Sequence, residues 1–291
     1  MINILLTGAS GQVGYELAPL LRTFGNVVAT DRNSLDLASA DAIVAKVRDV
    51  DPSIIVNAGA YTAVDVAERE RDIAFAINGR APGILAEEAK RRGALLVHYS
   101  TDYVFDGNAA TPYSENAPTN PLSVYGASKL EGERAIEASG AIALVFRTSW
   151  VYALRGRNFL LTMRRLAAER DELRVVDDQV GVPNWSRTLA QATARILARP
   201  DAAELRGLWH MSCTGQATWC DFARAIVGDR PHPRVTPIRT ADYPTPAKRP
   251  VYGVLDTSRF AETFGFSLPD WRSAYESCIA SPVEPPAHAV D

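Results

Sequence analysis

The chain has 291 residues, of which 47% are hydrophobic, and its formal net charge at pH 7 is -3. This composition predicts an ordinary soluble globular protein with a substantial buried core. Charges of both signs are interspersed, which argues against a nucleic-acid-binding protein, because such proteins usually carry a basic face or stripe. The three cysteines show neither a CxxC spacing nor a nearby histidine cluster, so neither a disulfide framework nor a zinc site is expected.

The first strand-like run follows the initiating methionine directly, without a basic segment and a long apolar stretch before it. No later stretch reaches about 18 consecutive apolar residues, the length that a membrane-spanning helix needs. We therefore expect a cytoplasmic protein without a membrane partner.

Residues 3–7 form a short apolar run, which fits a strand buried on both faces of a parallel sheet. Glycines at positions 8, 11 and 14 follow, and a helix-like run then extends through residue 21. Such glycines allow a tight turn, close approach of the backbone to a pyrophosphate, and tight packing of the helix on the strand. The spacing differs from GxGxxG by one residue, and a purely structural turn is the alternative. The residues expected to contact a cofactor here are Gly8, Ser10, Gly11, Gln12, Val13 and Gly14.

A second strand is expected at residues 27–30, and it ends at Asp31. A carboxylate in this position commonly accepts the ribose hydroxyls of NAD, whereas an arginine accommodates the extra phosphate of NADP. Because Arg32 follows at once, the pattern favours NADH without excluding NADPH, and Arg32 is equally well read as a solvated charge. Asp36 and Leu37 are expected near the adenine.

A third strand, residues 53–57, runs into Ala58, Gly59 and Ala60, small residues that let a cofactor lie against the backbone. The fourth strand, residues 94–99, delivers Thr101 to its carboxyl end, where ligands bind in open α/β sheets. We interpret His98, inside this strand, as a satisfied core histidine. Intervening helices are expected at residues 41–50, 64–71 and 81–92. This repeated alternation predicts a doubly wound parallel sheet.

Tyr125 and Lys129 lie on a helix expected at residues 123–138. Four residues are about one helical turn, so both side chains share a face. An ammonium beside a phenol, whose reference pKa is about 10, favours the phenolate and lowers that pKa toward the working range. Taken alone, this pair is more simply an amphipathic helix with a solvated lysine. The next strand, residues 143–147, ends near Trp150, so we expect groups from three elements to converge on one cleft.

After Trp150 the alternation of strands and helices weakens. The expected architecture is α/β, a Rossmann-type doubly wound parallel sheet with a smaller, interleaved C-terminal substrate-binding lobe. We expect residues 1–150 to form the NAD(P)-binding domain, with returning segments from about 173–212, and residues 151–291 to form mainly the substrate-binding lobe. Later helices are expected at 158–170 and 186–199, later strands near 174–176 and 208–210, and a loose tail at 281–291.

Together, the three glycines, Thr101 and Tyr125-x-x-x-Lys129 resemble the extended short-chain dehydrogenase/reductase superfamily. Longer blocks, at residues 60–68, 100–107, 147–152 and 243–250, resemble the dTDP-4-dehydrorhamnose reductase family. This resemblance implies NAD(P)H-dependent reduction of the 4-keto group of dTDP-6-deoxy-L-lyxo-4-hexulose to dTDP-L-rhamnose, a precursor of cell-surface polysaccharide. The implied partner is therefore a small-molecule dTDP-sugar.

The resemblance also implies a role for each matching residue. Thr101 polarises the carbonyl oxygen, Tyr125 protonates it, and Lys129 holds the nicotinamide ribose and stabilises the phenolate. Arg249 suits the substrate diphosphate, because a guanidinium matches phosphate geometry. The residues implied to bind substrate are Val64, Asp65, Thr101, Asp102, Tyr103, Trp150 and Arg249.

Three departures from the family pattern stand out. Asn184 replaces the last hydroxyl residue of a glutamine-aromatic-glycine-x-proline-threonine segment, which here also lacks its aromatic residue. Tyr252-Gly253 stands where an asparagine-serine pair is usual. Some members dimerise through magnesium held by acidic side chains. Glu16 fits one such position, but Arg187 occupies another, so we expect no metal site and a monomer rather than a metal-linked homodimer.

Other functions stay open. Another nucleotide-sugar 4-ketoreductase is one, and a 4-epimerase is a second, since it uses the same threonine, tyrosine and lysine but retains its NAD. A dehydratase would need an acid where Tyr103 stands. A non-catalytic regulatory subunit, resembling the beta subunit of methionine adenosyltransferase, is a different class. The complete set of Thr101, Tyr125 and Lys129 argues against it.

Overall fold

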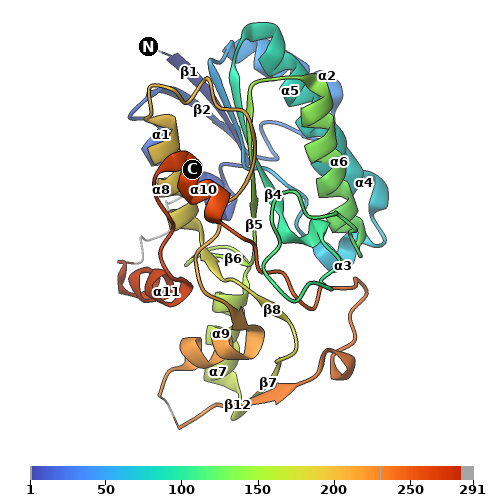
Figure 1. Cartoon of the computed structure of the whole chain (residues 1–291), viewed down its shortest axis with the longest axis vertical. Coiled ribbons are helices and arrows are strands. Elements are labelled where there is room, and N and C mark those ends of the chain that lie inside the picture. The colour runs from blue at the N-terminus through green and yellow to red at the C-terminus, as the bar shows by residue number, and fades with distance from the viewer. Residues whose placement is uncertain (1, 230, 283–291) are drawn as a thin grey trace.

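The computed structural model describes residues 2–229 and 231–282. A six-stranded sheet with helices on both faces forms the upper part in Figure 1, and a smaller lobe lies below the carboxyl ends of its strands. The first half of the chain contributes β1 Ile2–Thr7, α1 Gln12–Leu21, β2 Gly25–Thr30, α2 Ala40–Val50, β3 Ile54–Asn57, α3 Val64–Ala67, α4 Arg71–Phe75, η1 Ala76–Arg80, α5 Ala81–Arg92, β4 Leu95–Thr101, η2 Asp102–Val104, α6 Val124–Ser139 and β5 Ala143–Thr148. The second half contributes β6 Val151–Tyr152, α7 Phe159–Glu169, β7 Glu172–Val176, β8 Val180–Gly181, β9 Asn184–Trp185, α8 Ser186–Leu197, β10 Gly207–His210, β11 Ala217–Thr218, α9 Trp219–Val227, β12 Arg234–Ile238, η3 Thr240–Asp242, α10 Ser258–Phe264 and α11 Trp271–Ala280.

The main sheet has the strand order β10-β5-β4-β3-β1-β2, and every neighbouring pair is parallel. The chain passes from β1 outward to β2 and then crosses to the other side of β1 to form β3. The carboxyl ends of β1 and β3 therefore border the switch point of the sheet, where ligands bind in doubly wound folds. The expected α/β fold is confirmed.

Side chains of β1 alternate between two cores, as the period of a strand requires. Ile4 and Leu6 belong to the core beneath α1 and α8, whereas Leu5 belongs to the core beneath α2 and α5. Figure 1 shows these helix groups on opposite sides of the sheet. The expectation that this strand is buried on both faces is therefore confirmed.

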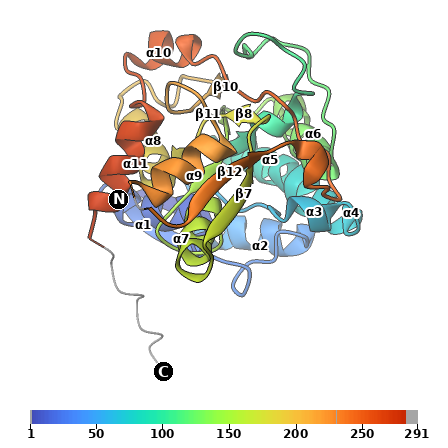
Figure 2. The ribbon, with the colours of Figure 1, turned by 90° about the horizontal axis from the view of Figure 1, so that it is seen from below.

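The smaller lobe is built around β7 and β12, which pair in parallel and lie side by side next to α9 in Figure 2. The sequence placed the return to the main sheet at about residue 173, but the strand there is β7, which pairs with β12. Alternate residues of β7 are exposed, whereas all six residues of β5 are buried. A strand with only one apolar face fits the smaller lobe. The segments that do return are α8, which packs against α1, and β10, which pairs with β5.

The helix that carries Tyr125 begins and ends close to the expected positions. The Ser123 hydroxyl caps α6 by accepting from the amide of Gly126, and Gly140 ends it with a φ of 67°. By contrast, the helix expected at residues 64–71 is divided into α3 and α4. The Glu68 carboxylate lies at this break and accepts from the amide of Val124 at 2.8 Å, so the break supports the start of α6.

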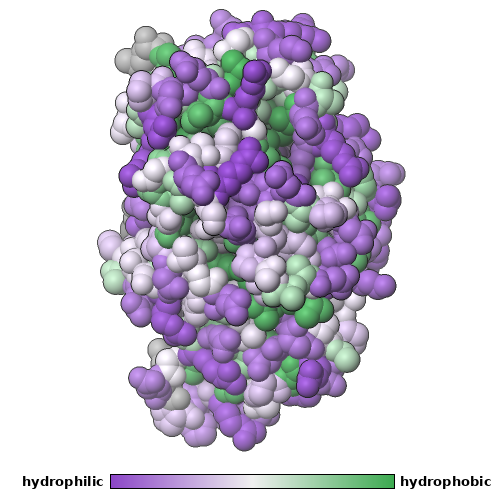
Figure 3. Space-filling model, viewed as in Figure 1, coloured by the Kyte–Doolittle hydropathy of each residue, from purple (hydrophilic) through white to green (hydrophobic). Residues whose placement is uncertain are grey.

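Hydrophilic side chains cover most of the face in Figure 3, and apolar side chains form small separate groups. The large hydrophobic residues that are exposed within the described part of the chain are Ile2, Leu122, Tyr243, Val251 and Ile279. Within the described residues, no helix is both long and apolar enough to cross a membrane. Apart from residues 281 and 282, the tail expected at the carboxyl terminus lies outside the described residues.

Candidate active site

The glycine turn after β1 packs directly on the turn after β3. Gly8 has a φ of +69°, and a Cβ atom there would lie 2.5 Å from the Cα atom of Gly59. A Cβ atom on Gly14 would lie 2.2 Å from the carbonyl oxygen of Gly8. Only glycine fits such backbone contacts. The turn thereby brings the first turn of α1 and the carboxyl end of β3 together.

The N-terminus of α1 is open toward a ligand. Gly11 is the N-cap residue, and no side chain caps the helix, so its first backbone amides are available to an anion. Gln12 ties this turn to the segment after Trp150, because its amide donates to the carbonyl oxygen of Val151 at 3.3 Å and accepts from Asn158 at 2.9 Å. An open helix N-terminus beside close-packed glycines fits the diphosphate of a dinucleotide.

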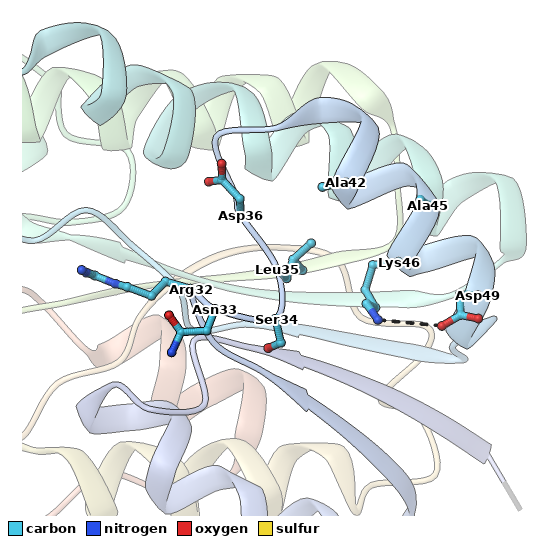
Figure 4. A pocket seen from close by; sticks show the side chains of 9 residues that line it. All are labelled: Arg32, Asn33, Ser34, Leu35, Asp36, Ala42, Ala45, Lys46 and Asp49. Carbon is cyan, nitrogen blue, oxygen red and sulfur yellow. Dashed lines mark ion pairs between the residues drawn. The ribbon is translucent and has the colours of Figure 1, made fainter.

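Asp31 and Arg32 lie together at the carboxyl end of β2. The Asp31 carboxylate accepts from the amide of Asn33 and from the hydroxyl of Ser34, and the Ser34 hydrogen bond is the largest cause that lowers its pKa. Figure 4 shows the pocket between this loop and α2, with the side chain of Arg32 extending away from Lys46. A carboxylate and a guanidinium thus lie together at the end of β2, the position where NAD-binding and NADP-binding proteins of this fold differ.

Thr101 and Tyr125 meet at the carboxyl end of β4. The Thr101 hydroxyl donates to Asp102 at 3.0 Å and accepts from the amide of Tyr103 at 3.1 Å, and it lies near enough to the Tyr125 phenol to lower the pKa of that phenol. The Tyr103 ring packs edge-on against the Tyr125 ring, with centroids 5.5 Å apart. The structure therefore places the groups expected to polarise the carbonyl and to donate the proton beside each other.

The pKa of Tyr125 differs in direction from the sequence-based expectation. Burial raises it to about 12, and the hydrogen bond with Thr101 opposes this rise. The expected neighbour, Lys129, directs its Nζ atom to the carbonyl oxygen of Tyr99 at 2.5 Å and to Nε2 of His98 at 3.2 Å. Burial lowers the pKa of Lys129 to about 8, and the charge of Glu133 opposes this fall. At neutral pH, Tyr125 is thus a protonated phenol.

Two residues that contact these side chains were not predicted from the sequence. Asn57 lies beside His98 in the register of β3 and β4, and its Nδ2 atom is 3.0 Å from the Nδ1 atom of His98. His98 is satisfied and buried, as expected, but one of its partners is Lys129. Asn78, in the π-helix η1, donates to the hydroxyl of Ser128 on α6. The available signal for Asn57 was a polar residue inside an otherwise apolar strand, beside the strand that carries His98.

Asp65 and Arg249, both expected to bind substrate, pair with each other. The guanidinium makes two hydrogen bonds to the carboxylate, at 2.7 Å and 3.1 Å, and the hydrogen bond from Arg249 is the largest cause that lowers the pKa of Asp65. Val64, next to Asp65, opens α3. The pair therefore joins the segment at residues 243–250 to the main domain.

Trp150 is held in an uncommon conformation. Its φ is +42°, and its ring stacks on Trp219 with centroids 3.5 Å apart and planes 7° from parallel. A Cβ atom on Gly181 would lie 2.5 Å from the indole ring. The stack and the missing Cβ together fix this ring beyond the end of β5.

Two of the departures from the family pattern are structural. Asn184 is fully buried, and its Nδ2 atom donates to the carbonyl oxygens of Ser149 and Val182, while its Oδ1 atom accepts from the amide of Cys213 at 2.6 Å. It therefore points into the protein. The Arg187 side chain donates to Glu16 at 2.7 Å, so the carboxylate at the possible metal position has a cationic partner.

Comparisons with known proteins agree with this geometry. A family model described as the RmlD substrate binding domain matches residues 2–283. A dTDP-4-dehydrorhamnose reductase of Burkholderia thailandensis is 48% identical, covering 96% of this chain and 98% of the relative. The structure of a dTDP-4-dehydrorhamnose reductase from Clostridium acetobutylicum has a TM-score of 0.90 at 38% identity and covers 96% of this chain and 98% of that chain. One from Bacillus anthracis, in complex with NADP, has a TM-score of 0.89 at 33% identity, with the same two coverages. The chain belongs to the dTDP-4-dehydrorhamnose reductase family.

Proposed function

We propose that this chain reduces the 4-keto group of dTDP-4-dehydro-6-deoxy-L-mannose, also called dTDP-6-deoxy-L-lyxo-4-hexulose, to dTDP-L-rhamnose with NADPH or NADH. The observation that carries this proposal is the placement of Thr101 and Tyr125 beside each other at the carboxyl end of β4, where Tyr103 contacts both. The names of the relatives, and the NADP bound to the Bacillus anthracis protein, support it. The chain accordingly uses a nicotinamide cofactor.

The switch point of the sheet suits this cofactor. The open N-terminus of α1 would bind its diphosphate, and Asp31 or Arg32 would contact the adenosine ribose or its phosphate. When bound, the nicotinamide supplies the hydride. The residues proposed to hold the cofactor are Gly8, Ser10, Gly11, Gln12, Val13, Gly14, Asp31, Arg32, Asp36, Leu37, Ala58, Gly59, Ala60, Tyr125 and Lys129.

Two side chains, those of Thr101 and Tyr125, act on the carbonyl oxygen. Thr101 donates a hydrogen bond to it, and Tyr125 transfers its phenolic proton as the carbonyl carbon gains hydride. The oxygen thereby becomes a hydroxyl and Tyr125 a phenolate. A phenol whose pKa burial raises to about 12 holds its proton at neutral pH until the developing alkoxide, a stronger base, takes it. The Lys129 ammonium stabilises the resulting phenolate.

The sugar nucleotide would lie between the main domain and the smaller lobe. Tyr103 and Trp150 would pack on the sugar ring, while Val64, Asp65 and Asp102 border it. Arg249 would bind the diphosphate by exchanging its bond to Asp65 for phosphate oxygens. The absence of a magnesium site, the monomeric state and the cytoplasmic location stay predictions. Magnesium-dependent dimerisation in sizing experiments would contradict the predicted absence of a magnesium site and the predicted monomeric state.

The test is oxidation of NADH and of NADPH with the dTDP-4-keto sugar generated in situ, followed by identification of the product. Net cofactor consumption distinguishes a reductase from a 4-epimerase, which retains its NAD. Tyr125→Phe is expected to lose about 10²- to 10⁴-fold in turnover while still binding cofactor. Tyr113→Phe is the matched control, since that phenol bonds Asp106. Unchanged turnover in Tyr125→Phe would refute the proposed role.

A further inference from the structure

A buried chain of hydrogen bonds leads from the glycine turn to the lysine of the candidate site. Thr7 donates to Oδ1 of Asn57 at 2.6 Å, Nδ2 of Asn57 is 3.0 Å from Nδ1 of His98, and Nε2 of His98 is 3.2 Å from Nζ of Lys129. These four side chains come from β1, β3, β4 and α6, and each is at most 2% exposed. Unpaired polar groups are costly at such depth.

His98 is the centre of this chain and is neutral. Burial lowers its pKa well below the usual range, and the charge of Lys129 lowers it further. A neutral imidazole has one N–H donor and one acceptor nitrogen. When one ring nitrogen carries the proton, the other must accept a hydrogen bond. His98 therefore cannot donate to Asn57 and to Lys129 at the same time.

The facing atoms of Asn57, His98 and Lys129 are paired in two arrangements. With Lys129 as an ammonium, Nζ donates to Nε2, so Nδ1 carries the proton and donates to Oδ1 of Asn57 after a 180° rotation of the amide. The Asn57 Nδ2 group then donates to the Thr7 hydroxyl. With Lys129 as an amine, the amide stands as described above, Nδ2 donates to Nδ1, and Nε2–H donates to Nζ. The two arrangements differ by one proton on Lys129.

We propose that Asn57 and His98 are positioning residues that keep Lys129 hydrogen-bonded in both charge states and thereby set the pH above which reductase activity falls. This inference rests on the proposed function, in which the ammonium of Lys129 stabilises the phenolate of Tyr125. Without the pair, loss or gain of a proton on Lys129 would leave a buried donor or acceptor unpaired.

Other groups also face Lys129 or its neighbours. Glu133, one turn further along α6, favours the ammonium, but two bonds from Arg147 on β5, at 2.6 Å and 2.9 Å, share its charge. The carbonyl oxygen of Tyr99 accepts from Nζ. Asp102 acts on Tyr125, whose pKa it raises. Because substitution of Asn57 or His98 leaves all of these groups in place, a change in pH dependence reports on the pair.

The test is kcat measured from pH 6 to 10 in the wild type and in His98→Met. This change removes a partner of Nζ in both charge states, but the charge-assisted bond from the ammonium is the stronger one, so the basic limb should move to lower pH by about one unit. His210→Met is the matched control. His210 is equally buried, but its Nδ1 atom lies 3.1 Å from the carbonyl oxygen of Asp256 on another part of the sheet. That variant should lose stability and keep the wild-type limb.

Two variants of Asn57 should move the basic limb of the pH profile in opposite directions. They provide the test if His98→Met does not fold. Asn57→Leu leaves Nδ1 unpaired in both arrangements, as an N–H donor with the ammonium and as an acceptor with the amine. An unpaired buried donor is the less tolerated of the two, so the limb should move to lower pH. Asn57→Asp gives that N–H a stronger acceptor, so the limb should move to higher pH. The inference would be overturned if the basic limbs of the pH profiles of these variants superimposed on that of the wild type or moved in the opposite directions.

An NMR titration of the Lys129 side chain, in the wild type and the same variants, separates this inference from the proposed function. If the wild type reduces the keto sugar and the Lys129 titration is unchanged by the variants, the inference fails alone. If the variants shift the titration but no variant or wild-type protein oxidises either cofactor, the proposed function fails and the hydrogen-bonded pair stands.

Discussion

Asp102 makes the stability of the fold depend on pH in an unusual direction. It is 2% exposed, its Oδ1 atom accepts from Thr101, and its Oδ2 atom has no hydrogen-bond partner among the described residues. A Cβ atom on Gly253 would lie 2.6 Å from that oxygen, so the backbone of Gly253 closes over it. Burial raises the pKa of this carboxyl to about 7.

The sign follows from the difference between the folded and unfolded states. The unfolded carboxyl titrates near 3.8, while the folded one titrates near 7, so the folded state binds the proton more tightly. Stability is full below about pH 4, falls as the pH rises toward 7, and is constant above that. About three pKa units at 1.36 kcal/mol each give a loss of about 4 kcal/mol. Asp102→Asn removes this loss.

Urea unfolding at pH 5 and pH 8 measures the effect. About two of the three pKa units lie between pH 5 and pH 7, so Asp102→Asn should gain about 2.7 kcal/mol over the wild type at pH 8 relative to their difference at pH 5. Asp106→Asn is a control for which the difference from the wild type should be the same at pH 5 and pH 8, because both lie above the pKa of Asp106 in the folded and unfolded states. The amide of Asn108 is the largest cause that lowers the pKa of Asp106, so its contribution is present at both pH values and lost only in stronger acid. Equal differences between Asp102→Asn and wild type at both pH values would refute the reasoning.

Three further substitutions test the supports of the site. Arg147→Met strands the buried carboxylate of Glu133 and should cost about 3–5 kcal/mol in urea unfolding, with partial recovery when Glu133→Gln is added. Trp219→Leu removes the stack under Trp150 and should raise the KM for the sugar nucleotide about two- to tenfold with kcat retained; a fall in kcat alone would contradict this. Asn184→Ala leaves several buried backbone groups unpaired and should cost about 2–3 kcal/mol in thermal unfolding without changing KM.

Local pattern was sufficient to predict the parts of the fold that depend on neighbours in sequence. The glycine turn, the strand that leads to Thr101 and the helix of Tyr125 were predicted from glycine spacing, apolar runs and the spacing of four between Tyr125 and Lys129. The pairing of β7 with β12 joins segments about 60 residues apart, and no local signal specifies the partner of a short strand. The start of the return to the main sheet was misplaced for this reason.

The candidate site shows the same division. The positions of Tyr125 and Lys129 on one helical face follow from helix geometry, but the direction of the Tyr125 pKa shift does not. That direction depends on how deeply the phenol is buried and on the partners that Nζ finds on β4, both of which are tertiary properties. A spacing in the sequence therefore predicts which groups meet more reliably than it predicts their charge.

The departures from the family pattern have different consequences in the structure. Asn184 replaces a hydroxyl with an amide that joins several backbone groups in the interior, so it affects the joint between the lobes. Gly253 stands where the family pattern has a serine, and it faces the unpaired oxygen of Asp102. A hydroxyl near that oxygen could donate to it, whereas glycine leaves the carboxyl with the proton it binds below about pH 7. Because Asp102 also accepts from Thr101, this departure couples the substrate side of the cleft to the group expected to polarise the carbonyl.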